Sequence, residues 1–173
     1  VFSVSFMAVV VTVGIILGQK LGDGDKKGAK EDSVRLIVFS TLLGIGVTIL
    51  YCAFAPFIPH LYQGEDFTPA IRTLATQMMI VGALSMPIDA FAHATYFTLR
   101  SGGQVFITIL FDSVYMWVVN VPVAFLLMEY TALPFLVIYA ICHAVNILKC
   151  ILGGWLVKKG IWVRTIVDTP NPQ

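Results

Sequence analysis

Residues 34–57 read VRLIVFSTLLGIGVTILYCAFAPF, an almost unbroken apolar run whose single charge is Arg35. About 20 such residues, coiled into a helix, span the hydrocarbon core of a bilayer. A lone strand cannot cross lipid, because its backbone donors and acceptors would be left without hydrogen bonds. The run therefore predicts a transmembrane helix.

The composition of the whole chain agrees with a membrane protein. Of the 173 residues, 58% are hydrophobic and 12% are charged, and the mean hydropathy is +0.87. A soluble domain has about twice that share of charged residues, which it needs to cover a hydrated surface. The net charge of +1 also excludes a nucleic-acid binder, which requires a dense basic face.

Further apolar segments lie on both sides of this run, separated by charges, glycines or prolines. We predict an all-α integral membrane protein with five transmembrane helices. These form one partial lobe over residues 1–167, followed by a disordered tail at 168–173. The chain starts at Val1 without a basic stretch before the first apolar run, which favours a cut through a longer protein over a signal peptide. The expected helices cover approximately residues 1–18, 34–57, 70–99, 104–128 and 134–157.

The distribution of basic residues predicts the orientation of these helices. If the polar loop at 20–33 is cytoplasmic, alternating spans place ten of the 11 Lys and Arg residues on that side and leave only Arg72 opposite. Cytoplasmic loops of membrane proteins carry this excess of positive charge. We therefore expect a cytoplasmic C-terminus. The ten residues are Lys20, Lys26, Lys27, Lys30, Arg35, Arg100, Lys149, Lys158, Lys159 and Arg164.

The third expected helix carries a polar stripe, since Asp89, His93, Tyr96 and Arg100 follow at i, i+4, i+7 and i+11 on one face. Asp89 lies about 15 Å from the cytoplasmic end, near the middle of the bilayer. An ionisable group at that depth must face the bundle interior or water. Pro87 removes a backbone hydrogen bond at the same level. We interpret Asp89 as a proton- or cation-binding carboxylate; the alternative is a structural Asp–His pair.

The fourth expected helix places Asp112 at a depth similar to that of Asp89. Met116 and Asn120 follow Asp112 on the same face and are predicted to line the cavity with His93 and Tyr96. Two carboxylates at one depth can share a proton or flank a cation. The alternative is that Asp112 pairs with Arg100 or caps a neighbouring helix.

Two other patterns point to helix packing. Gly14, Gly18 and Gly22 recur every four residues on the first helix, a spacing that lets two helices approach closely in lipid. A weaker polar stripe on the fifth helix is more typical of contacts between helices than of a site. That stripe consists of Tyr139, His143, Asn146 and Cys150.

Motifs for catalysis or metal binding are not seen in the sequence. It contains no H-E-x-x-H or G-x-S-x-G motif, and its three cysteines form no C-x-x-C pair. We therefore predict no enzyme, no metal site and no cofactor other than a coupling ion.

Four stretches of this sequence resemble the multidrug and toxic compound extrusion (MATE) transporters. They are VGIILGQKLGDGDKKGAK (13–30), HATYFTLRSGGQ (93–104), FDSVYMWVVNVPVAFLL (111–127) and LKCILGGWLVKKGIWVR (148–164). The resemblance covers nearly the whole chain and corresponds to the last five of that family's twelve helices. In some members a carboxylate on the tenth helix helps to bind the coupling cation, and Asp89 falls at about that place.

The resemblance implies a secondary antiporter of two six-helix lobes in a bacterial plasma membrane. Such a protein exports small cationic or amphipathic compounds in exchange for protons or sodium ions, and its other partners are the bilayer and the N-terminal lobe. A related lipid-linked oligosaccharide flippase is one alternative, but its cavity needs several basic residues to hold a pyrophosphate. A non-transporting membrane scaffold is the other, and it predicts that the intramembrane polar groups tolerate Ala.

Overall fold

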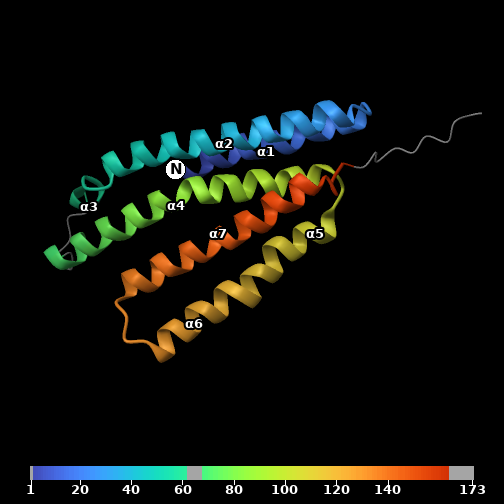
Figure 1. The fold of residues 1–173 in the computed structure, drawn as a ribbon. Coiled ribbons are helices and arrows are strands. Elements are labelled where there is room, and N and C mark those ends of the chain that lie inside the picture. Colours follow the sequence, from blue (N-terminus) through green and yellow to red (C-terminus); the bar gives the residue numbers. More distant parts are fainter. Residues whose placement is uncertain (1, 62–67, 164–173) are drawn as a thin grey trace, which may run out of the picture.

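The computed structural model of the chain describes residues 2–61 and 68–163, and every regular element in these ranges is helical (Figure 1). This confirms the all-α prediction. The expected tail at 168–173 lies outside the described residues. The elements are α1 (Phe2–Gly22), α2 (Lys26–Phe54), α3 (Ile58–Leu61), α4 (Pro69–Ser101), α5 (Val105–Ile109), η1 (Leu110–Val114), η2 (Met116–Asn120), α6 (Val121–Tyr130) and α7 (Phe135–Lys159).

Within the described ranges, 4 helices are long and apolar enough to cross a membrane: Lys26–Phe54, Pro69–Ser101, Phe106–Tyr130 and Phe135–Lys159. Helix α1 adds a shorter apolar stretch, Met7–Gly22. A helix satisfies its own backbone hydrogen bonds, so each of these segments can enter lipid without exposing polar groups. The chain is a multi-pass membrane protein.

Helix α2 starts at Lys26, well before the residue at which its apolar run begins. The Asp25 carboxylate accepts a hydrogen bond of 2.9 Å from the backbone N–H of Gly28, and this caps the helix. Gly24 has a φ of 81°, which suits the tight turn between α1 and α2. Most of the expected loop at 20–33 is therefore helical, because α1 extends to Gly22 and α2 already begins at Lys26.

The two faces of α2 reverse the pattern of a soluble helix. Its buried face carries mostly small or hydroxyl side chains, which allow close contact with other helices. Its exposed face carries large apolar side chains, which suit lipid. The buried residues are Ala29, Ser33, Ile37, Ser40, Gly44 and Thr48; the exposed ones include Val34, Phe39, Leu42, Ile45 and Ile49.

The contact between α2 and α4 compensates for the proline inside α4. Pro87 has no N–H to donate to the carbonyl of Ala83, one turn earlier. The Thr48 hydroxyl of α2 lies 2.8 Å from that carbonyl oxygen and donates to it, and it also lies 2.9 Å from the carbonyl of Gly44. A Cβ on Gly44 would come within 2.8 Å of the Ala90 Cβ, so only glycine allows this approach. Figure 1 shows α4 changing direction near its middle.

Helix α4 packs against α1, α2 and α7, while the α5–α6 segment lies on the far side of α7 (Figure 1). The α1–α2 turn, the α4–α5 turn and the end of α7 lie at one end of the bundle, which we call the basic end. At this end Lys20 and Asp32 form an ion pair. The turn between α6 and α7 lies at the opposite end. Arg164 of the predicted orientation lies outside the described residues.

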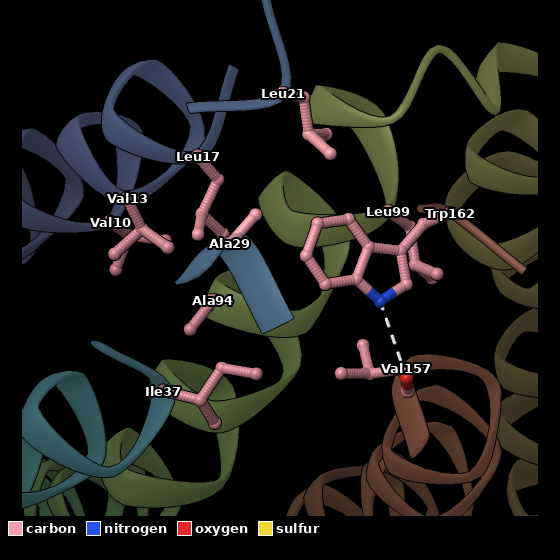
Figure 2. Packing of buried hydrophobic residues seen from close by; sticks show 10 residues of the cluster. All are labelled: Val10, Val13, Leu17, Leu21, Ala29, Ile37, Ala94, Leu99, Val157 and Trp162. Carbon is pink, nitrogen blue, oxygen red and sulfur yellow. Dashed lines mark hydrogen bonds between the residues drawn. The ribbon is translucent and has the colours of Figure 1, made fainter. Parts of the chain in front are cut away.

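A cluster of buried hydrophobic side chains from α1, α2, α4 and α7 holds the basic end together (Figure 2). Trp162 is fully buried in this cluster. Its indole N–H donates a 3.2 Å hydrogen bond to the carbonyl oxygen of Val157, near the end of α7. The segment that follows α7 is thereby fixed against the helices.

Candidate functional site

A cavity of about 420 Å³ lies among α1, α2, α4 and α7. Its wall is mostly thioether and aromatic, and its carboxylate, imidazole and serine groups come from α4 and α7. We call it the main cavity. Its lining includes Met7, Met78, Met79, Met86, Tyr51 and Tyr139, together with the polar residues Ser85, Asp89, His93 and His143.

Asp89 is the acidic residue of the main cavity and is only partly exposed. One of its carboxylate oxygens lies 3.4 Å from the Ser85 hydroxyl. The ring Nδ1 of His93 lies 2.7 Å from the main-chain carbonyl oxygen of Asp89, so this contact does not involve the carboxylate. None of the ion pairs among the described residues includes Asp89. A carboxylate in this setting can take up a proton or a cation.

The predicted stripe on α4 divides between two cavities. Asp89 and His93 line the main cavity, whereas His93, Tyr96 and Arg100 line a second cavity of about 200 Å³. His93 therefore belongs to both. The second cavity lies nearer the basic end and is the more polar of the two, since Asp112 and Lys149 also line it.

Asp112 forms an ion pair with Lys149 of α7, with 2.7 Å between Oδ1 and Nζ. Arg100, the partner considered from the sequence, lines the same cavity but does not form this pair. The Lys149 side chain is 15% exposed and the Asp112 side chain is 59% exposed, so the lysine is mostly covered while its carboxylate partner is open. Asp89 and Asp112 line different cavities, and the structure does not bring the two carboxylates into one site.

Met116 and Asn120 line neither of these cavities. The Asn120 side-chain amide donates to the Asn146 side chain of α7 at 3.2 Å and lies 3.4 Å from the Met116 sulfur. Met116 and Asn120 lie in η2, where the helix widens into π-helical turns just before Pro122. A proline supplies no N–H to the preceding turn, which favours this irregular geometry. In this structure, Asn120 links η2 to α7 and Met116 contacts it.

The structure adds Tyr139 and His143 to the main cavity, although their stripe was assigned to packing. Their rings meet edge to face, with centroids 4.6 Å apart. The i, i+4 spacing places both residues on one face of α7, but the sequence does not show that this face meets Asp89. Cys150 does serve packing, because its thiol lies 3.2 Å from the carbonyl oxygen of Ile88 in α4.

The three glycines of α1 differ in their surroundings. A Cβ on Gly14 would lie 3.3 Å from the Phe97 ring of α4, which is a close helix contact. A Cβ on Gly18 or Gly22 would meet no atom of the described residues within 4 Å. Close packing at Gly18 and Gly22 remains a prediction, and it requires a partner other than the described residues.

Comparison with known proteins identifies the family. A family model described as MatE matches residues 1–126, which is more than half of the chain. The chain belongs to the MATE family of transporters. The match confirms the family resemblance and covers the stretches at 13–30 and 93–104 and nearly all of that at 111–127, while the stretch at 148–164 lies beyond it. The described residues include no group of three or more His, Cys, Asp or Glu side chains arranged to hold a metal ion.

One curated MATE relative is the multidrug resistance protein NorM of Aliivibrio fischeri (strain ATCC 700601 / ES114). It is 29% identical over 121 residues, which cover 70% of this chain and 26% of NorM. This MATE chain therefore spans only a part of that relative's length. No solved structure gives a significant match to the chain.

Proposed function

We propose that the protein carrying this chain is a secondary antiporter that exports small cationic or amphipathic compounds in exchange for protons or sodium ions. The observation that supports this is the placement of Asp89, midway along α4, in a cavity walled by methionine and tyrosine side chains. A carboxylate at this depth favours a proton or a cation as its ligand. Aromatic faces and polarizable thioethers suit flat organic cations.

Antiport follows if proton or sodium and cargo compete for this one carboxylate. Either ligand neutralises Asp89, so binding of one lowers the affinity for the other. Exposure of the cavity to one side of the membrane at a time then exchanges them. In this proposal the chain supplies five of twelve helices, an N-terminal lobe completes the cavity, and the protein resides in a bacterial plasma membrane.

The lining of the main cavity favours this proposal over a lipid-linked oligosaccharide flippase. A pyrophosphate needs several cationic donors, and no lysine or arginine of the described residues lines the main cavity. Arg100 and Lys149 line the smaller cavity, where Lys149 forms an ion pair with Asp112. A non-transporting scaffold is distinguished from both by a transport assay.

The test is transport by the complete protein in vesicles loaded with ethidium. We expect an imposed proton or sodium gradient to accelerate ethidium efflux over that from the same vesicles without a gradient. Vesicles without protein control for leakage. If neither gradient accelerates efflux, antiport is contradicted; translocation of a pyrophosphate-linked lipid would then support the flippase.

We expect the basic end to be cytoplasmic, because ten basic residues then lie on the side where positive charge gathers. Lys27 lies in the first turn of α2 at this end, and Ala132 lies in the turn between α6 and α7 at the opposite end. Lys27→Cys should resist a membrane-impermeant maleimide in intact cells, whereas Ala132→Cys should react. Permeabilised cells, in which both should react, provide the control. The reverse labelling pattern would contradict the orientation.

A further inference from the structure

Two adjoining grooves are lined by α2, α4 and α7, and α4 packs against both of the other helices (Figure 1). Their volumes are about 500 and 560 Å³. Phe91 and Gly154 line both grooves, so the two join at this point, and together we call them the α2–α7 groove. A Cβ on Gly154 would lie only 3.3 Å from the Phe91 ring, so the glycine keeps the junction open.

The α2–α7 groove has about the length of one lipid leaflet. Its lining extends from Lys30 to Thr41 on α2 and from Ile147 to Lys158 on α7. Each of these stretches rises about 16 Å along its helix. Half of a hydrocarbon core of about 30 Å is about 15 Å. The groove also opens outward, because Val38 on one wall is 51% exposed and Ile151 on the other is 63% exposed.

The side-chain hydroxyl and thiol groups within the groove already have partners. The Thr41 hydroxyl donates a 2.8 Å hydrogen bond to the carbonyl oxygen of Ile37, and the Ser33 hydroxyl donates one of 2.7 Å to that of Lys30. The Cys150 thiol lies 3.2 Å from the carbonyl oxygen of Ile88. The remaining surface is mostly apolar, so it suits a hydrocarbon chain.

Two lysines lie at the basic end of the groove, Lys30 of α2 and Lys158 of α7. Both are exposed, and neither side chain forms an ion pair within the described ranges of the chain. Glu31 follows Lys30 in the sequence but pairs with neither lysine, and Asp32 is paired with Lys20. Lysine stems can lie along apolar surface while the ammonium groups reach the interface. The groove thus ends in two unpaired positive charges.

We infer that the α2–α7 groove binds one anionic phospholipid from the leaflet at the basic end. An acyl chain lies along the groove past Phe91 and Gly154, and the phosphate lies between Lys30 and Lys158. Basic pockets between transmembrane helices bind anionic lipid headgroups in this way. A zwitterionic lipid carries an additional cationic group, which the two lysines repel. The inference does not depend on antiport, because it needs only the groove, its charges and the bilayer.

The test uses the purified complete transporter, stripped of lipid in detergent. It is titrated with phosphatidylglycerol or with phosphatidylcholine of the same acyl chains, and native mass spectrometry resolves each bound lipid. We expect one phosphatidylglycerol to bind more tightly than any phosphatidylcholine. Equal affinities would overturn the inference. So would the absence of bound lipid, because another helix of the complete protein would then cover the groove.

Charge variants test the headgroup site. Replacing both Lys30 and Lys158 by Gln should weaken phosphatidylglycerol binding about thirtyfold, the loss expected for two lysines beside an anionic headgroup. Each single variant should weaken it about fivefold, which keeps the test usable if the double variant does not fold. The double variant Lys26→Gln, Lys27→Gln is the matched control, because these lysines lie at the same end of α2 but do not line the groove. Wild-type affinity in the Lys30 and Lys158 variants, or an equal loss in the control, would contradict the site.

A bulky substitution tests the acyl-chain site separately. Val38→Trp should fill the groove and weaken phosphatidylglycerol binding, whereas Phe39→Trp introduces the same ring at an exposed neighbouring residue outside the groove and should not. Wild-type affinity in Val38→Trp would show that the chain lies elsewhere. Glycerol 3-phosphate, which has the phosphate but no chain, should not displace the lipid. Displacement by it would indicate a simple anion site and overturn the inference.

Discussion

Replacement of Asp89 by Asn is expected to reduce gradient-driven efflux to the rate of vesicles without protein, while the protein still folds. Asparagine has nearly the size of aspartate, and its side-chain oxygen can still accept the hydrogen bond from Ser85. It can neither ionise nor exchange a proton, so cargo and coupling ion lose the single charge for which they compete. The effect should therefore be on transport and not on stability.

The measurement is ethidium efflux from loaded vesicles under an imposed proton or sodium gradient, with expression and thermal stability checked in parallel. Glu129→Gln is the matched control, because it makes the same chemical change at an exposed carboxylate near the end of α6. If Asp89→Asn exports ethidium at the wild-type rate, Asp89 is structural. Coupling would then have to reside at Asp112 or in the other lobe.

Gly102→Ala is expected to destabilise the protein by about 3 kcal/mol, the upper end of the usual cost of overpacking. A Cβ at this position would lie 1.8 Å from the carbonyl oxygen of Trp162 and 2.6 Å from its carbonyl carbon. These are backbone atoms, which cannot turn aside as a flexible side chain can. To make room, the segment after α7 must move away from the α4–α5 turn.

That movement would disrupt the contacts that fix this segment. The buried Trp162 indole would be drawn from its cluster and from the carbonyl of Val157, and Gln104 would lose its 3.3 Å hydrogen bond to the carbonyl of Ile161. Thermal unfolding in detergent, followed by tryptophan fluorescence, should show a midpoint several degrees lower. Gly46→Ala is the control: its Cβ would meet no atom of the described residues within 4 Å, and alanine is the better helix former. Equal midpoints for Gly102→Ala and wild type would contradict this packing.

The sequence by itself determined that the chain is helical and embedded in a membrane. Long apolar runs such as residues 34–57 allow only helices, since lipid offers no partners to an open backbone. The sequence also determined which residues share a helix face, as in the stripe that begins at Asp89, because the helical repeat depends only on spacing. The start of α2 at Lys26 was not predicted, because hydropathy detects the apolar run and not its polar extension.

Only the tertiary structure decided which helix faces meet. Spacing predicted a shared depth for Asp89 and Asp112. In the structure, Asp112 forms an ion pair with Lys149 of α7 and lines a separate cavity. Conversely, the stripe assigned to packing on α7 brings His143 to the cavity of Asp89. The rotation of a helix about its axis depends on close contacts with its neighbours. One example is the Tyr139 hydroxyl, which lies close to α4 at Gly82, a residue without a side chain. Those contacts join residues far apart in the chain, so they cannot be predicted from local periodicity or hydropathy.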